Sequence, residues 1–245
     1  MTEISDAELA ARLAVAAGDI LLAVRASGLL HDAGLGKAGD RTANAFLMQA
    51  LAERRPDDAV LSEESADDKV RLTRSRVWII DPLDGTREYG EGRTDWAVHV
   101  GLAVDGCAMV GAVALPGLGL VQRSDQPPPL PSIGRRLRML VSRSRPAAEA
   151  LAVAKAMDAD LAPMGSAGAK AMAVVRGEAD IYLHSGGQYE WDNCAPVAVA
   201  QAAGLHVTRL DGSPMRYNAE NTWLPDLLIC RPELATQARA AIARL

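Results

Sequence analysis

Apolar residues recur through the first part of the chain with the spacing of amphipathic helices. Ser5 or Asp6 can cap a first helix, which is predicted to end near Ser27-Gly28. The glycine-rich residues 32–40 are predicted to form a flexible loop. The second helix follows this loop and is predicted to end at Pro56. The apolar positions are Leu9, Leu13, Ala16, Ala17, Ile20, Leu21 and Val24 in the first helix and Ala43, Phe46, Leu47, Ala50 and Leu51 in the second.

The pattern then changes to short apolar runs, which predict buried strands. A brief strand over residues 59–61 is followed by the acidic pair Glu63-Glu64. A second strand, residues 77–80, continues into Asp81-Pro82-Leu83-Asp84-Gly85. Because proline cannot donate to a sheet ladder, this strand is predicted to stop at the first aspartate, and Asp84-Gly85 to form a tight turn. Two carboxylates are thereby placed close together at a rigid strand end.

The longest apolar tract, residues 96–121, predicts a hairpin and not a membrane span. Asp105-Gly106, Pro116 and several glycines interrupt it, which argues against a transmembrane helix. Asp-Gly between two apolar runs is typical of a type I′ turn, so residues 97–104 and 107–115 are predicted to pair as buried strands. The N-terminal residues lack the basic start and apolar stretch of a signal peptide, and a cytoplasmic protein is expected.

Proline and polar residues dominate segment 122–131, which can form neither a helix nor an inner strand. This segment is the best candidate for a domain boundary. It predicts an N-terminal α+β domain over residues 1–124 and a C-terminal α/β domain over residues 134–245, in which strands alternate with helices. The predicted strands of the second domain are residues 138–141, 179–183, 206–209 and 227–230, and its predicted helices are residues 146–157, 169–176, 192–203 and 232–245.

Composition removes several function classes. The 245 residues are enough to bury a sizeable core. A net charge of −5 argues against a protein held to nucleic acid by phosphate contacts. The cysteines Cys107, Cys194 and Cys230 form no CxxC pair, which argues against a zinc ribbon or redox motif and favours reduced thiols.

Acidic residues are the strongest candidates for chemistry. Asp81 and Asp84 flank Pro82-Leu83, although a turn requires only one aspartate. Two carboxylates so close repel each other unless a cation lies between them, and oxygen ligands without His or Cys favour Mg²⁺ or a similar ion. Strand ends that point the same way converge at one sheet edge, so Glu63 is expected nearby. Asp40, Glu64 and Asp192 are further candidates, although each alone is more simply a surface acid or, for Asp192, a helix cap.

Other motifs carry less weight. Residues 34–39 fit G-x-G-x-x-G, but no strand precedes them, so a dinucleotide site is disfavoured. Met164 replaces the first glycine of a serine hydrolase motif at residues 164–168. His99 lies inside an apolar strand and is more simply a hydrogen-bonded core residue than a metal ligand.

The acidic motifs resemble those of a known family. Asp81-Pro82-Leu83-Asp84-Gly85-Thr86 resembles the first signature of the inositol monophosphatase superfamily of Mg²⁺-dependent, lithium-sensitive phosphatases. Glu63-Glu64 is similar to the acidic pair of that family, and Trp191-Asp192 to its second signature. Arg87-Glu88-Tyr89 resembles the bacterial CysQ-type 3′(2′),5′-bisphosphate nucleotidases, especially actinobacterial members. Residues 141–145, Gly165-Ser166 with Lys170, and residues 211–214 resemble the same branch.

The resemblance implies the layered αβαβα sandwich of inositol monophosphatases and fructose-1,6-bisphosphatases, with most metal ligands in the first domain. It implies that Glu63, Asp81, the Leu83 carbonyl, Asp84 and Asp192 hold two or three Mg²⁺ ions. Asp40 and Thr86, with help from Glu63, would orient a water and accept its proton. Backbone N–H groups at Asp84, Gly85 and Thr86 would meet the phosphate.

The resemblance also implies a substrate. Family members of this branch hydrolyse 3′-phosphoadenosine 5′-phosphate, and in some cases its sulfated form, to AMP or adenylyl sulfate in sulfur assimilation. Lys170, with Arg143 or Arg145, is expected to meet the second phosphate, and Ser166 and Glu190 the ribose or base. Inositol 1-phosphate and fructose 1,6-bisphosphate are alternative phosphorylated substrates. A nucleotide-binding module without enzymatic activity and an inactive scaffold are alternatives from other classes. A homodimer is left open, and neither nucleic acid nor a membrane is expected as a partner.

Overall fold

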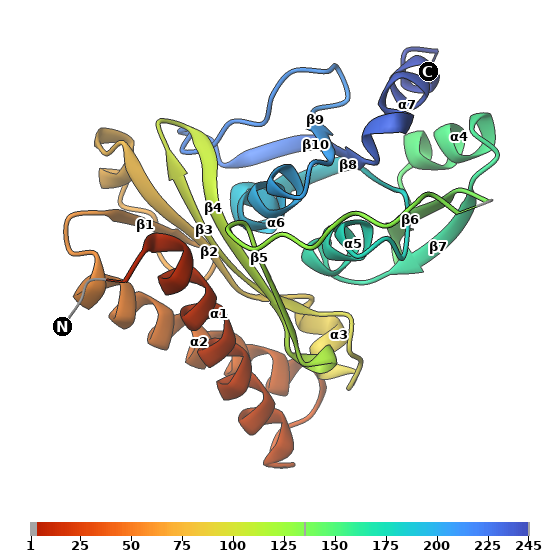
Figure 1. The fold of residues 1–245 in the computed structure, drawn as a ribbon. Helices are drawn as coiled ribbons and strands as arrows, with labels where there is room; N and C mark the ends of the chain where they lie inside the picture. The colour runs from red at the N-terminus through yellow and green to blue at the C-terminus, as the bar shows by residue number, and fades with distance from the viewer. Residues whose placement is uncertain (1–3, 135, 245) are drawn as a thin grey trace.

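Two sheets form the frame of the protein, which a computed structural model describes over residues 4–134 and 136–244 (Figure 1). Each sheet has five strands. The first runs in the order β1 (Ala59–Ser62), β2 (Arg76–Asp84), β3 (Ala97–Val104), β4 (Cys107–Leu115), β5 (Leu120–Arg123). The second runs in the order β7 (Asp160–Met164), β6 (Arg138–Ser142), β8 (Ile181–Tyr189), β10 (Trp223–Cys230), β9 (His206–Thr208).

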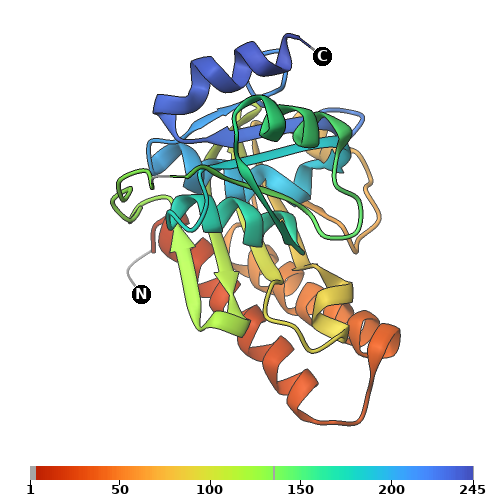
Figure 2. The same cartoon turned by 90° about the vertical axis from the view of Figure 1, so that its right-hand side faces the viewer.

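Helices cover both sheets and separate them. The long helices α1 (Asp6–Ala26) and α2 (Asp32–Arg54) cover the outer face of the first sheet, and α5 (Ala167–Val175) and α6 (Glu190–Ala202) lie between the sheets. Helices α4 (Ala148–Ala156) and α7 (Ala235–Ile242) cover the outer face of the second sheet. Figure 2 shows these layers stacked, with α1 and α2 at the bottom and α7 at the top. The predicted αβαβα layering is confirmed.

Alternation along β2 explains why helices pack on both of its faces. Trp78 and Ile80 are buried against α1 and α2, whereas Val77 and Ile79 are buried in the central core. Side chains of successive strand residues point to opposite faces, so an unbroken apolar run signals a strand covered on both sides. The central core continues from this strand through α5 and α6 to Tyr182 on the second sheet. The two predicted domains therefore share the central core, and their division at the proline-rich segment stays a prediction.

The prediction of a flexible loop over residues 32–40 is wrong, because these residues form the first turns of α2. Their glycines allow close packing that a Cβ atom would prevent. A Cβ on Gly36 would lie 2.6 Å from Thr86 Cγ2, and one on Gly39 would lie 2.9 Å from Leu21 Cδ2. Tertiary contact thus outweighs the low helix propensity of glycine. As part of a helix, the G-x-G-x-x-G segment does not form a phosphate-binding loop after a strand.

The predicted end of the second strand at Asp81 is also wrong. Strand β2 continues to Asp84, and its register shifts from Asp81 opposite His99 to Asp84 opposite Ala97. Three steps along β2 therefore match two along β3, which is the signature of a β-bulge. Proline is tolerated at a bulge because no ladder hydrogen bond is required of it there. The bulge holds both aspartates in the sheet edge, and Gly85, with φ of 89°, then begins the short helix α3 (Thr86–Gly90).

The hairpin prediction is confirmed residue for residue. Strands β3 and β4 pair antiparallel, with Asp105 at φ 48° and Gly106 at φ 75° in the turn between them. Positive φ at both central positions is what a type I′ turn requires. The prediction missed β5, β7 and α3, which are short. In the described ranges, 4–134 and 136–244, none of the helices combines the length and the apolar character needed to cross a membrane.

Candidate active site

Three carboxylates meet between the two halves of the chain. One oxygen from each of Asp81, Asp84 and Asp192 lies within 4.8 Å of the other two. The first two come from the bulged end of β2, and Asp192 comes from the first turn of α6, where it also accepts a hydrogen bond from the Tyr189 N–H at 2.5 Å. Burial and the neighbouring Glu63 and Asp84 raise the pKa of Asp81 well above its usual range. A set of carboxylate oxygens that repel one another in this way fits a divalent cation.

Two further predicted residues lie at the border of this cluster. Glu63 follows β1, and although solvent reaches its side chain, enclosure by the protein and the charges of Asp192 and Asp84 raise its pKa to about 7. Asp40 on α2 is buried, and burial together with Glu64 and Glu63 raises its pKa to about 8. Its Oδ1 finds no hydrogen-bond partner within the described part of the chain. A buried, unpartnered carboxylate oxygen is costly, which supports a water or cation completing the site.

Asp84 differs from its neighbours because hydrogen-bond donors surround one of its oxygens. Its Oδ2 accepts from the Ser166 hydroxyl at 2.5 Å and from the Gly168 N–H at 2.7 Å. His99 Nε2 lies 3.2 Å from the same oxygen, at ion-pair distance though without hydrogen-bond alignment. Burial alone would raise the pKa of Asp84, but these contacts lower it to about 2. The carboxylate is therefore held ionised through one oxygen, which leaves the other available to the cluster.

His99 lies against the acidic cluster, a position that the sequence analysis missed. The interpretation as a buried core histidine is confirmed, since its Nδ1 lies 3.0 Å from the Trp191 carbonyl oxygen. The same ring, however, connects Asp84 to the α6 turn that carries Asp192. Burial would lower the pKa of His99, but Asp84 outweighs burial and the net shift is upward. The feature that reveals this position of His99 is the antiparallel register of β2 and β3, which places His99 directly opposite Asp81.

Replacing Gly168 with alanine is expected to disturb this contact. A Cβ at residue 168 would lie 2.0 Å from His99 Nε2, so either the imidazole or α5 must move. We expect a loss of about 1–3 kcal/mol in the free energy of unfolding, measured by urea denaturation. Gly34→Ala on α2 is the matched control, because its Cβ would meet nothing within 4 Å, and it is expected to be neutral or stabilising. Equal stability of both variants would contradict the proposed crowding.

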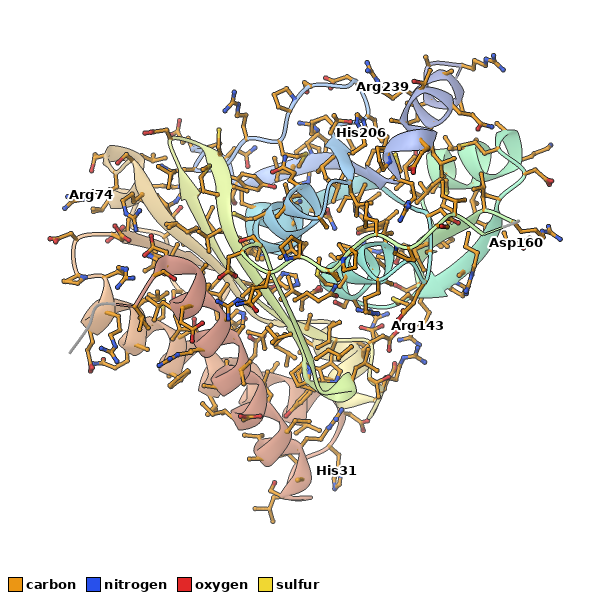
Figure 3. All side chains as sticks on the ribbon, in the orientation of Figure 1. His31, Arg74, Arg143, Asp160, His206 and Arg239 are labelled. Atoms are coloured by element: carbon orange, nitrogen blue, oxygen red, sulfur yellow. The ribbon has the colours of Figure 1, made fainter. Side chains whose placement is uncertain are left out.

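A cavity of about 370 Å³ opens beside the acidic cluster. Its lining includes the carboxylates of Asp84 and Asp192 together with several cationic side chains. Arg143, labelled in Figure 3, is paired with Glu88 at 2.7 Å and Glu91 at 2.9 Å. The lining residues are Asp84, Gly85, Thr86, Arg87, Glu88, Ser142, Arg143, Ser144, Arg145, Gly165, Ser166, Ala167, Lys170, Tyr182, His184, Gly187, Gln188, Tyr189 and Asp192.

Lys170, predicted to contact substrate, is a buried lysine and not an ordinary exposed helix residue. Its Nζ donates to the carbonyl oxygens of Gly165 at 2.8 Å and Ser166 at 2.6 Å, and lies 5.2 Å from the Tyr182 ring centre. Burial lowers its pKa to about 8. An ammonium has three donors, so two carbonyls leave one for a ligand in the cavity.

Glu190, the other acidic residue predicted to contact substrate, is placed elsewhere. Its side chain is fully buried, and its two oxygens accept from the N–H groups of Asn218 at 2.7 Å and Ala219 at 2.8 Å. It does not line the cavity. The prediction that Glu190 contacts ribose or base is therefore corrected: Glu190 anchors the loop before β10. A buried carboxylate must satisfy its acceptors, and the nearest donors here are backbone groups distant in sequence.

Comparison with known proteins agrees with this geometry. The model of the "Inositol monophosphatase family" matches residues 6–244. A protein of Mycobacterium leprae named 3′-phosphoadenosine 5′-phosphate phosphatase is 50% identical over 95% of this chain and 92% of its own. The crystal structure of CysQ from Bacteroides thetaiotaomicron covers 92% of this chain and 97% of its own, with 25% identity and a TM-score of 0.80. The structure of SaIMPase-II with bound 2′AMP has a TM-score of 0.78 at 18% identity, covering 97% of this chain and 96% of its own.

Proposed function

This chain belongs to the inositol monophosphatase family, and we propose that it is a Mg²⁺-dependent phosphatase that hydrolyses the 3′-phosphate of 3′-phosphoadenosine 5′-phosphate. The products are AMP and phosphate; the sulfated form of the substrate would give adenylyl sulfate, as in sulfur assimilation. The observation that carries the substrate assignment is the 50% identity, over nearly the whole chain, to the mycobacterial protein that bears this activity in its name. A cavity lined by both acidic and cationic groups supports it, because the substrate carries two phosphates.

The metal would be held by the acidic cluster. We assign Glu63, Asp81, the Leu83 carbonyl, Asp84 and Asp192 as ligands of two or three Mg²⁺ ions. The Leu83 carbonyl at present accepts a hydrogen bond from Thr86 Oγ1 at 3.1 Å, so it lies beside the catalytic threonine. When bound, Mg²⁺ supplies Lewis acidity toward the phosphoryl oxygens and lowers the pKa of water.

Thr86, Asp40 and Glu63 are proposed to position the attacking water and accept its proton. Asp40 lies one helical turn after Gly36 on α2, and Gly36 packs directly against Thr86. Asp40 is not assigned as a metal ligand, and burial with the neighbouring Glu64 and Glu63 raises its pKa to about 8, near neutral pH, where a general base is most effective. The lack of a hydrogen-bond partner for Asp40 Oδ1 among the described residues leaves that oxygen available to a water.

The substrate phosphates would lie on opposite sides of the cavity. Asp84, Gly85 and Thr86 line it where the scissile phosphate would meet the acidic cluster and backbone N–H groups. For the second phosphate, Arg145 is a better candidate than Arg143. Arg143 is already paired with two glutamates, whereas Arg145 has no ion pair in the described ranges. Lys170, with one donor left, would also meet the second phosphate. Ser166 would accept from a ribose hydroxyl, because its own O–H already donates to Asp84.

Phosphate release from purified protein tests this proposal. We expect the specificity constant for 3′-phosphoadenosine 5′-phosphate to exceed those for inositol 1-phosphate and fructose 1,6-bisphosphate, and all turnover to need Mg²⁺.

Li⁺ at millimolar concentration is expected to inhibit, because a small monovalent ion at a Mg²⁺ position neutralises less phosphate charge. A higher constant for either alternative substrate would reassign the substrate. Full turnover in EDTA, or no response to Li⁺, would contradict the assigned metal site.

A cytoplasmic location and a homodimer complete the proposal. Fractionation of cells and light scattering of the purified protein would test each directly.

A further inference from the structure

An exposed tyrosine at the edge of the cavity takes no part in the chemistry described above. Tyr189 is the last residue of β8 and lines the cavity, yet the residue is 47% exposed. Its ring stacks on Trp191, with ring centres 4.8 Å apart and planes 10° from parallel. Trp191 packs in turn against the central core. One face of the tyrosine ring is therefore covered by the indole, so the exposed area of the ring is expected on the opposite face.

The backbone fixes this ring relative to the acidic cluster. The Tyr189 N–H donates to Asp192 Oδ2, and residue 189 is paired with Trp223 across the β8–β10 ladder. The Trp223 indole in turn fills the space over Gly187, where a Cβ would lie 2.3 Å from its Nε1. These contacts tie the backbone of Tyr189 to Asp192, the stack on Trp191 orients its ring, and Tyr189 lines the same cavity as Asp84 and Asp192.

Of the aromatic rings that line the cavity, Tyr189 belongs to the most exposed residue, since His184 is half-buried. Tyr182 is buried beneath Lys170. The other walls carry the carboxylates of Asp84 and Asp192 and cationic groups such as Arg145. A nucleoside bisphosphate presents two phosphates and one flat base, and this cavity presents charged groups and one well-exposed tyrosine ring. Any nucleobase can stack on an aromatic ring, because every base has a π-face.

We propose that the open face of Tyr189 is the platform on which the purine base of the substrate stacks. The proposal rests on the nucleotide phosphatase function proposed above and adds a residue that selects nucleotides over phosphorylated sugars. Since Tyr189 precedes Asp192 by one turn, the base and the scissile phosphate would be positioned from the same helix start.

Selectivity kinetics test the platform. In Tyr189→Leu, which keeps apolar contact with Trp191 but has no π-face, we expect KM for 3′-phosphoadenosine 5′-phosphate to rise roughly 5- to 100-fold, with a smaller change in kcat. The ratio of its specificity constant to that for inositol 1-phosphate is expected to fall by the same factor. Tyr189→Phe is expected to retain the ratio, because the phenyl ring still stacks. An unchanged ratio in Tyr189→Leu would overturn the proposal.

Binding measurements separate this proposal from the proposed function. By calorimetry, Tyr189→Leu is expected to weaken AMP binding roughly 5- to 100-fold while the affinity for ribose 5-phosphate, which lacks the base, changes much less. If the wild-type protein binds AMP through Tyr189 but does not hydrolyse the bisphosphate, the function fails and the platform stands. Equal loss of affinity for both ligands would overturn the platform even where hydrolysis is observed.

Discussion

Asp84→Asn is expected to lower kcat/KM for 3′-phosphoadenosine 5′-phosphate by about 10³-fold, since the variant loses a negative charge where the acidic cluster is proposed to hold Mg²⁺. The amide oxygen of asparagine can still accept from the Ser166 hydroxyl and the Gly168 N–H. Local packing should therefore survive, and the loss should appear in metal affinity and turnover. Steady-state phosphate release over a range of Mg²⁺ concentrations measures it.

Asp19→Asn is the matched control for this substitution, because Asp19 is exposed on α1, far from the cluster in sequence and on the outer helical layer. It is expected to leave kcat/KM unchanged. Circular dichroism and urea denaturation should show both variants folded. Wild-type turnover by Asp84→Asn at saturating Mg²⁺ would mean that Asp84 is not a metal ligand.

Sequence patterns correctly predicted the elements of the fold whose boundaries depend on neighbouring residues in the chain, such as a helix cap or a tight turn. The 3.6-residue repeat and Ser5 predicted α1, whose cap is seen in the Ser5 Oγ contact with the Glu8 N–H. Asp105-Gly106 predicted the hairpin to the residue, because a type I′ turn fixes the register of its strands. The errors arise where distant contacts decide. Gly36 and Gly39 are helical because Thr86 and Leu21 lie against them, and no local window contains those neighbours.

In the candidate site, too, local motifs predicted some residues, whereas distant contacts decide the roles of others. The sequence motifs pointed to Asp81, Asp84 and Asp192, and the structure brings these three together. Roles that depend on what faces a side chain were not predictable. Glu190, adjacent in sequence to Trp191-Asp192, points away from the cavity to the N–H groups of Asn218 and Ala219. His99 looked like a core residue because its strand is apolar, and only the pairing of β2 with β3 reveals its contact with Asp84.

Removal of metal is expected to make stability depend on pH in a direction opposite to ordinary acid denaturation. Burial and neighbouring acids raise the pKa of Asp40 from 3.8 to about 8 and that of Asp192 to about 6. Between about pH 4 and these values, the folded metal-free protein holds protons that the unfolded chain has released. Stability therefore falls as pH rises through this window. We expect the free energy of unfolding in EDTA to decrease by roughly 1–4 kcal/mol from pH 5 to pH 8.

Mg²⁺ should reverse this dependence, because a bound cation stabilises the ionised carboxylates of the folded state. At a hundred times its dissociation constant, it contributes about 2.7 kcal/mol, and the gain should be larger at pH 8 than at pH 5, where protons compete for the same oxygens. Urea denaturation at both pH values, with EDTA or with Mg²⁺, measures the effect. Asp40→Asn, which removes one of the groups with raised pKa, should flatten the pH dependence in EDTA. A metal-free protein that is more stable at pH 8 than at pH 5 would show that burial and mutual repulsion do not raise the pKa values of these acids.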